Sequence, residues 1–302
     1  MRKILFTFVK KSVSPQIFEH MTTQKTPQVM GIINVNEESF FSGSRFTAAD
    51  EIHRQVEEMI SQGASILDLG ACSTRPGSTP VTMEQEWEYL KVALEVVGKK
   101  FQGTKTIYGD NVKFSIDTFR SEIVRRGYDM IGSFTVNDIS AGEDDMQMLP
   151  TVGKLKLPYI AMHKRGTPDT MQQMCHYPQG VVEAVTEYFQ EFEERAAEYG
   201  IEEFIIDPGF GFAKNLEQNY TLFKGMPQIV SLLEKSHGKR RKLLVGISRK
   251  GMIWRPLGIT PDEALCGTAA LNLQALLLGA DIIRVHDVKE AVQCVKLWEC
   301  LK

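Results

Sequence analysis

Short apolar or β-branched runs recur along the chain, and charged segments separate them. Such runs favour β-strands, because they are brief, rich in Val and Ile, and bounded by polar residues or glycine. The sequence contains eight of them, at residues 28–35, 65–69, 112–116, 133–139, 157–162, 202–207, 242–247 and 281–286.

The segments between the predicted strands place apolar residues three and four positions apart, as on one face of an α-helix. Thr47 followed by Asp50 resembles the start of the first helix, and Gly63, Gly200 and Gly279 stand where glycines end helices. The clearest helical patterns are AADEIHRQVEEMISQG, MEQEWEYLKVALEVVGKK, VVEAVTEYFQEFEERAAEYG and PDEALCGTAALNLQALLLGA.

Strands that alternate with helices pair in parallel through helical crossovers. Eight such units predict an α/β fold of the closed (β/α)8 TIM barrel type, which typically takes about 250 residues. We predict one barrel domain over residues 28–302 and an N-terminal extension over residues 1–27, interpreted as an extra strand or cap. A doubly wound open sheet is the competing fold.

Composition narrows the class of protein. With 43% hydrophobic and 24% charged residues, the 302-residue chain resembles soluble globular proteins and predicts no membrane span. The formal net charge of −3 argues against a nucleic-acid binder, which normally carries a basic excess. Five scattered cysteines argue against a disulfide framework or a zinc site. Without a signal-peptide pattern at the N-terminus, the sequence indicates a cytoplasmic protein.

Charged glutamates are interpreted as solvated helix surface, as most runs of charge are. This interpretation covers Glu86, Glu88 and the acidic run at 191–198.

Polar side chains follow nearly every predicted strand. In a barrel the active site lies at the carboxyl ends of the strands, so these side chains should meet at one rim. Asp117 and Asp207 end apolar runs, where a carboxylate is costly unless a ligand or a basic group pairs with it, and we take both as ligand contacts. The other strand-end residues are Asn34, Asp68, Asn137, Asp138, His163, Ser248, Arg249, Lys250, Arg284 and His286.

The predicted rim divides by charge. Asp117, Asn137 and Asp207 offer acceptors and an amide to a flat, nitrogen-rich heterocycle. The groups able to gather around an anion are Arg75, Lys250, Arg284 and His286. The ligand that satisfies both sets is a phosphorylated or diphosphorylated heterocycle, since the planar fork of arginine suits phosphate oxygens.

A series of motifs resembles the dihydropteroate synthase family of pterin-binding barrels. They occur in the family's order across about residues 28 to 290, and together they are highly specific. The matching stretches are MGIINVNEESF, DLGACSTRPGSTPV, SIDTF, VNDISAG, AMHKRGTPDTMQ, DPGFGFAKN, VGISRKGMI, GTAA and RVHDV.

The resemblance implies a transferase that joins 6-hydroxymethyl-7,8-dihydropterin diphosphate to p-aminobenzoate, assisted by Mg²⁺ and inhibited in its family by sulfonamides. It implies small-molecule substrates, no nucleic-acid or membrane partner, and a homodimer. Asn34 matches the metal ligand. The implied pterin-diphosphate contacts are Thr74, Asp117, Asn137, Asp207, Lys250, Arg284 and His286. Those to p-aminobenzoate are Phe40, Pro76, Phe212 and Gly251. We expect catalysis from Asp117, Lys250, Arg284 and Arg75.

Several positions depart from the family pattern. Cys72 replaces a usual Glu, Gly251 follows Ser-Arg-Lys where Ser is usual, and the first loop reads NEESF. Two alternatives to the synthase remain, and only the second rests on the altered first loop and Gly251. One is a pterin-binding methyltransferase, which would have no use for a diphosphate clamp. The other is a non-catalytic pterin-binding paralogue.

Overall fold

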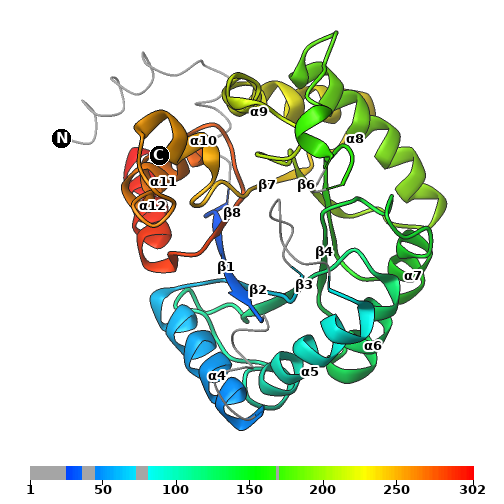
Figure 1. Ribbon diagram of the computed structural model, residues 1–302, viewed down its shortest axis with the longest axis vertical. Coiled ribbons are helices and arrows are strands. Elements are labelled where there is room, and N and C mark those ends of the chain that lie inside the picture. Colours follow the sequence, from blue (N-terminus) through cyan, green and yellow to red (C-terminus); the bar gives the residue numbers. More distant parts are fainter. Residues whose placement is uncertain (1–24, 36–44, 73–80, 168–169) are drawn as a thin grey trace.

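The structure, a computed structural model, describes residues 25–35, 45–72, 81–167 and 170–302. Within these segments eight parallel strands close into a barrel in chain order, and β8 pairs with β1 (Figure 1). The predicted (β/α)8 barrel is confirmed, and the competing open sheet is wrong. The strands are β1 (Gln28–Asn34), β2 (Ile66–Gly70), β3 (Lys113–Asp117), β4 (Thr135–Asp138), β5 (Tyr159–Met162), β6 (Phe204–Asp207), β7 (Lys242–Val245) and β8 (Ile282–Val285).

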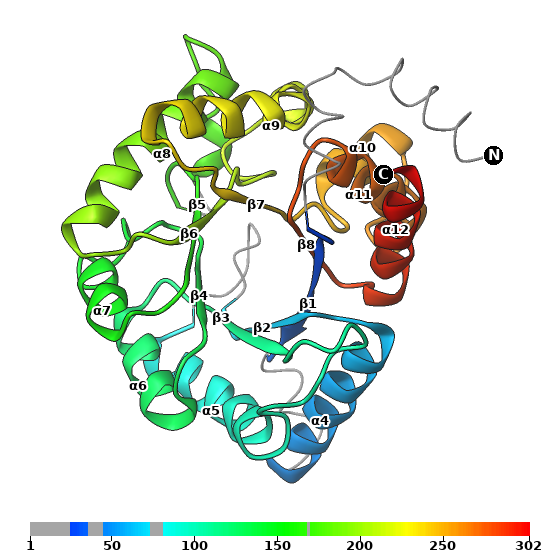
Figure 2. The ribbon, with the colours of Figure 1, turned by 180° about the vertical axis from the view of Figure 1, so that it is seen from behind.

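Helices form an outer ring around the strands, which the view from behind shows equally well (Figure 2). None of the described helices is both long and apolar enough to cross a membrane. They are α4 (Arg45–Gln62), α5 (Met83–Lys100), α6 (Ser121–Ile131), α7 (Met148–Leu155), α8 (Val181–Glu198), α9 (Leu216–His237), α10 (Gly251–Leu257), α11 (Leu265–Leu277) and α12 (Val288–Leu301), with a short 3-10 turn η1 (Met171–Gln173).

Helix ends follow the capping signals in most places. Gly63, Gly200 and Gly279 follow α4, α8 and α11 with positive φ angles of 107°, 70° and 95°, which glycine adopts without steric cost. Helix α4 begins at Arg45, so the start predicted at Thr47 is two residues late. The proposed boundary at residue 27 stays a prediction, because most of residues 1–27 lies outside the described segments.

The barrel interior changes from apolar to polar along the strands. Side chains of a strand alternate between its two faces, so every second residue points inward. One inward-facing cluster is apolar and fills the barrel interior. Two residues after the members of this cluster on β2 and β8, the inward face carries Asp68 and Arg284. The apolar cluster consists of Met30, Ile66, Ile160, Leu244 and Ile282. A polar layer therefore rests on a packed floor at the carboxyl ends of the strands.

Two glutamates expected on solvated surfaces are buried instead. Glu86 of α5 is 0% exposed and pairs with Arg120, and Glu193 of α8 is buried and pairs with Arg241. Glu86 lies four residues before Leu90, which puts both on the apolar face of the helix. The solvated-surface interpretation is wrong for these two residues, because charge alone does not report which helix face a residue occupies.

Candidate active site

An arginine from β8 lies between two carboxylates at the centre of the barrel. Arg284 Nε donates to Asp68 Oδ2 and Arg284 Nη2 donates to Asp117 Oδ2, each at 2.7 Å. Strands β3 and β8 are not neighbours, so the ion pair reaches across the barrel mouth. The side chains of Arg284 and Asp117 are 21% and 20% exposed, whereas Asp68 is fully buried. A ligand that enters from the rim can therefore touch Arg284 and Asp117.

Two further predicted acceptors surround this arginine. Asn137 Nδ2 donates to Asp68 Oδ2 at 2.9 Å, so its amide faces the same carboxylate as Arg284. Asp207 ends β6 and accepts the backbone N–H of Gly209 at 2.8 Å through Oδ1. Asp207 also lies close enough to Arg284 for each charge to act on the other. Asp117, Asn137, Asp207 and Arg284 therefore meet in one place, as the strand-end pattern predicts.

The cations are not gathered apart from the acceptors, as the predicted division of the rim by charge would have them. Arg284 lies within the acidic group. Lys250 donates from Nζ to the carbonyl of Phe210 at 2.6 Å, and its Nζ lies 4.9 Å from the centre of the Phe212 ring. His286 follows β8, and its Nδ1 lies 3.0 Å from Ser248 Oγ.

Burial perturbs the protonation of Asp117. It raises the pKa of Asp117 to about 7, against the pull of the Arg284 guanidinium, and the negative charges of Asp68, Glu86 and Asp138 add to the rise. A carboxylate with a pKa this far above its ordinary value is typical of a functional site. For Arg284, burial opposes the charged form, but Asp68 and Asp117 outweigh it and raise the pKa.

Lys250 and Asp207 lie close enough to affect each other's ionisation. Burial lowers the pKa of Lys250 to about 8, an effect that Asp207 opposes. Burial also raises the pKa of Asp207, while Lys250, the Gly209 N–H and Arg284 draw it down. A neutral form of Lys250 is thus within reach near neutral pH, unlike that of an exposed lysine.

Some strand-end residues serve the scaffold rather than the central cluster. Asp138 accepts from the Tyr159 hydroxyl at 2.6 Å and from the backbone of Ser140 and Gly142, so it caps its own loop. Arg249 makes a two-pronged ion pair with Asp287, at 2.7 Å and 3.1 Å. The sequence placed both residues at the rim but carried no signal for which way each side chain turns.

A buried lysine closes the loop after β6. Lys214 Nζ lies 2.9 Å from His163 Nδ1 and donates to the carbonyls of Gly209 and Phe212 at 3.0 Å and 2.9 Å. Burial lowers the pKa of Lys214 to about 7, against Asp207. The lysine fixes the loop that carries Phe212, a role that the sequence left open.

A second buried cluster joins α5 to the end of β3. Glu86 accepts from the Thr118 hydroxyl at 2.6 Å and pairs with Arg120, whose Nη2 donates to the carbonyl of Val81 at 2.6 Å. Burial and the Glu86 charge raise the pKa of the nearby Cys72 thiol. The Cys72 thiol therefore stays protonated near neutral pH.

Asn34 is the candidate magnesium ligand, and it is exposed at the end of β1. Mg²⁺ commonly takes one or two protein ligands and completes its octahedron with water and substrate phosphates. Among the described residues there is no group of three His, Cys, Asp or Glu side chains placed to hold a metal. One exposed amide oxygen fits an ion that takes its other ligands from a diphosphate and from water.

The predicted p-aminobenzoate residues are described in part. Phe212 is half-buried beside Lys250, and Gly251 opens α10 directly after that lysine. Phe40, Thr74, Arg75 and Pro76 lie outside the described residues, so their predicted roles stay predictions.

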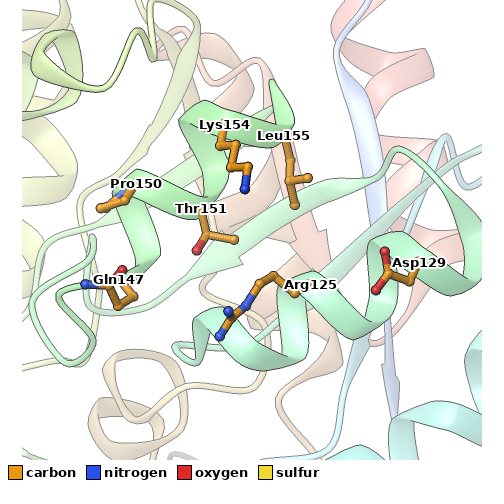
Figure 3. Close-up of a pocket in the computed structure, with 7 residues that line it drawn as sticks. All are labelled: Arg125, Asp129, Gln147, Pro150, Thr151, Lys154 and Leu155. Carbon is orange, nitrogen blue, oxygen red and sulfur yellow. The ribbon is translucent and has the colours of Figure 1, made fainter.

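A groove of about 350 Å³ lies on the outer surface, between α6 and α7 (Figure 3). Arg125 and Asp129 line it from α6, and Thr151 and Lys154 line it from α7. It shares no residue with the cluster at the barrel centre, so it does not belong to the candidate active site.

Comparisons with known proteins agree with this geometry. The model of a family described as pterin binding enzyme matches residues 30–286. The dihydropteroate synthase of Escherichia coli (strain K12) is 36% identical over 275 residues, which cover 90% of this chain and 91% of that protein.

Two solved structures share the fold over nearly the whole chain. The dihydropteroate synthase of Yersinia pestis with a sulfonamide drug is 32% identical, with a TM-score of 0.79 over 91% of this chain and 94% of that one. The Xanthomonas albilineans dihydropteroate synthase with 4-aminobenzoic acid is 30% identical, with a TM-score of 0.78 over 92% and 93%.

Proposed function

This chain belongs to the pterin-binding enzyme family, and we infer that it catalyses the dihydropteroate synthase reaction of folate biosynthesis. The reaction joins 6-hydroxymethyl-7,8-dihydropterin diphosphate to p-aminobenzoate and releases diphosphate. The observation that carries this inference is the Arg284 guanidinium held 2.7 Å from Asp117 at the barrel mouth, which puts a phosphate-binding cation beside acceptors for a ring.

The ring contacts follow from the polarity of the cluster. A pterin presents N–H and amino donors along its pyrimidine edge, and Asp117, Asn137 and Asp207 supply oxygen acceptors. A ring that enters the cluster loses its water contacts, so each donor needs a fixed acceptor. We assign these three side chains to the pterin.

The diphosphate contacts come from the cations. When the C–O bond to the pterin methylene breaks, its electron pair leaves on a diphosphate oxygen, and Lys250, Arg284 and His286 would stabilise that charge. Fixed cations do so without the reorganisation that water would need. The amine of p-aminobenzoate then attacks the methylene carbon and loses a proton to solvent. A neutral aniline is nucleophilic, so the step needs no strong base.

We propose that Mg²⁺ assists at the outer side of the diphosphate, with Asn34 as its protein ligand. The bound ion would neutralise phosphate charge as it develops. The exposed position of Asn34 at the end of β1, on the same rim as Arg284, supports this assignment.

We propose that p-aminobenzoate binds nearer the opening, against Phe212 and close to Gly251. The contact between Phe212 and Lys250 supports this, because it puts an aromatic surface beside the lysine. Arg75, Thr74, Pro76 and Phe40 would complete the two substrate sites from loops outside the described residues.

We also propose a homodimer in the cytoplasm. The α10–α12 side of the barrel supports the dimer, because Leu257 and Leu297 are 58% and 54% exposed there. Exposed large apolar side chains on one side are a feature of association surfaces.

The test is turnover by the purified protein. Incubation with dihydropterin diphosphate, p-aminobenzoate and Mg²⁺ should give dihydropteroate and diphosphate in equal amounts. Tight pterin binding without product would instead identify a non-catalytic paralogue. Transfer of a methyl group with no release of diphosphate would identify a pterin-binding methyltransferase.

A further inference from the structure

A carboxylate of β2 lies beneath the candidate active site. Asp68 points into the barrel, is fully buried, and pairs in register with Ser115 of β3. It lies two residues above the apolar floor, as Arg284 does, and its 0% exposed side chain is the most buried charged group of the central cluster. A buried carboxylate is costly unless charged or polar partners compensate it, so its partners indicate what it is for.

Both partners of Asp68 are predicted substrate contacts. Its Oδ2 accepts from Arg284 Nε at 2.7 Å and from Asn137 Nδ2 at 2.9 Å. Its Oδ1 has no hydrogen-bond partner in the part of the chain that the structure describes. Asp68 therefore concentrates its interactions on one oxygen and on two side chains that face the ligand.

These contacts fix the orientation of each partner. An ionised carboxylate only accepts hydrogen bonds, so the Asn137 amide must turn its NH2 toward Asp68. The amide oxygen of Asn137 then points elsewhere and is presented as an acceptor. In the same way, the Nε contact holds the Arg284 guanidinium so that its Nη2 reaches Asp117.

We propose that Asp68 is a positioning residue for substrate binding, which sets the Asn137 amide as an acceptor for the pterin and holds Arg284 at Asp117. This rests on the proposed function, because the pterin supplies the donors that Asn137 meets. Asp68 itself touches no solvent and acts through its two neighbours.

The substitution Asp68→Asn tests this role with little change of shape. The new amide oxygen can occupy the position of Oδ2, and the new NH2 falls where Oδ1 had no partner. The negative charge disappears, and the Asn137 amide gains a neighbour that can donate as well as accept, so its orientation is no longer fixed. Ser115→Ala is the matched control, because Ser115 is equally buried on the adjacent strand and its hydroxyl has no partner among the described residues.

The charge of Asp68 also has a readout that a merely structural role would not move. Asp117 is faced by Arg284 from β8, Asp68 from β2, Glu86 from α5 and Asp138 from β4, and Lys250 lies near it. Removal of one negative neighbour favours the ionised form of Asp117, so its pKa falls. The acid limb of pterin binding should therefore move to lower pH in Asp68→Asn.

The experiment measures binding of 6-hydroxymethylpterin to the full chain by calorimetry from pH 5 to 9, with steady-state kinetics for both substrates. At pH 8 we expect Asp68→Asn to bind pterin at least tenfold more weakly, with an acid limb shifted downward and the KM for p-aminobenzoate unchanged. Ser115→Ala should match the parent. Pterin affinity within twofold of the parent, or an unshifted acid limb, would overturn the proposal.

A second measurement on the unmodified protein applies even if Asp68→Asn does not fold. The side-chain NH2 of Asn137, followed by NMR with 15N-labelled asparagine, should exchange with solvent far more slowly than that of an exposed asparagine. Fast exchange would refute the contact and the role. If the parent protein itself fails to bind pterin, the proposed function is at fault, and not the role of Asp68.

Discussion

Replacement of Glu86 tests whether the buried cluster between α5 and β3 stabilises the barrel. Glu86→Ala removes a carboxylate that is 0% exposed and leaves Arg120 and the Thr118 hydroxyl without their acceptor. Breaking a buried ion pair by removing one partner costs about 3–5 kcal/mol. The Arg120 side chain is 22% exposed, so water relieves part of the cost, and the lower end of that range applies.

The expected loss of about 3 kcal/mol in the free energy of unfolding would lower the melting temperature by roughly 5 °C. Urea denaturation followed by circular dichroism measures the free energy. Glu95→Ala on the same helix is the control, because it removes an exposed ion pair instead of a buried one. Glu95 is 44% exposed, and its Oε2 lies 3.8 Å from Lys99 Nζ. Surface pairs of this kind contribute about 1 kcal/mol or less.

The same variant should lose activity. Arg120 binds the carbonyl of Val81, and Thr118 follows Asp117 directly, so the cluster fixes the end of one active-site strand. We expect kcat/KM to fall while the Glu95→Ala control keeps it. Equal unfolding free energies for the two variants would refute the reasoning that Glu86 is a buried structural anchor.

The remaining predictions concern single site residues. Asp117→Ala should weaken pterin binding by about 3 kcal/mol, since hydrogen bonds to a charged group are lost. In the parent protein the pterin affinity should fall as the pH drops through about 7, because protonation of Asp117 removes the acceptor. A calorimetric affinity that changes neither with the substitution nor with pH would contradict both expectations. Arg284→Ala should weaken the binding of dihydropterin diphosphate more than the binding of bare pterin. Equal losses of affinity for the two ligands would count against a diphosphate contact. Gly251→Ser should lower the KM for p-aminobenzoate about fivefold if the serine hydroxyl makes one hydrogen bond of about 1 kcal/mol to the substrate. The serine fits because its Cβ would lie 3.0 Å from Arg255 Nε, at the end of a flexible side chain. A raised KM would refute this. Lys214→Met should lower the free energy of unfolding by about 2 kcal/mol through lost hydrogen bonds, as measured by urea denaturation. An unchanged denaturation midpoint would show that the loop after β6 keeps its structure without the lysine.

The sequence predicted the barrel because its strands are short, apolar and regularly separated by helices. The same regularity put Asp117, Asn137, Asp207 and Arg284 on one rim, since the carboxyl ends of parallel strands converge. The direct ion pair between Arg284 and Asp117 was not predictable, because strands β3 and β8 are far apart in the chain and are not neighbours in the sheet.

Other features were missed for identifiable physical reasons. Glu86 was assigned to a solvated surface by its charge, although its spacing from Leu90, Leu94 and Val97 places it on the buried face of α5. The inward position of Asp68 can be read from strand alternation, but its choice of partners depends on side-chain packing across the barrel.

The central claim is that one molecule of dihydropterin diphosphate spans the acceptors and the cations at the barrel mouth. A crystal structure of the protein with this substrate or a non-hydrolysable analogue tests it most directly. We predict ring N–H groups within hydrogen-bond distance of Asp117 and Asp207, with the diphosphate against Arg284 and His286. A ring bound elsewhere, for example in the groove between α6 and α7, or a diphosphate turned away from Arg284, would contradict the account.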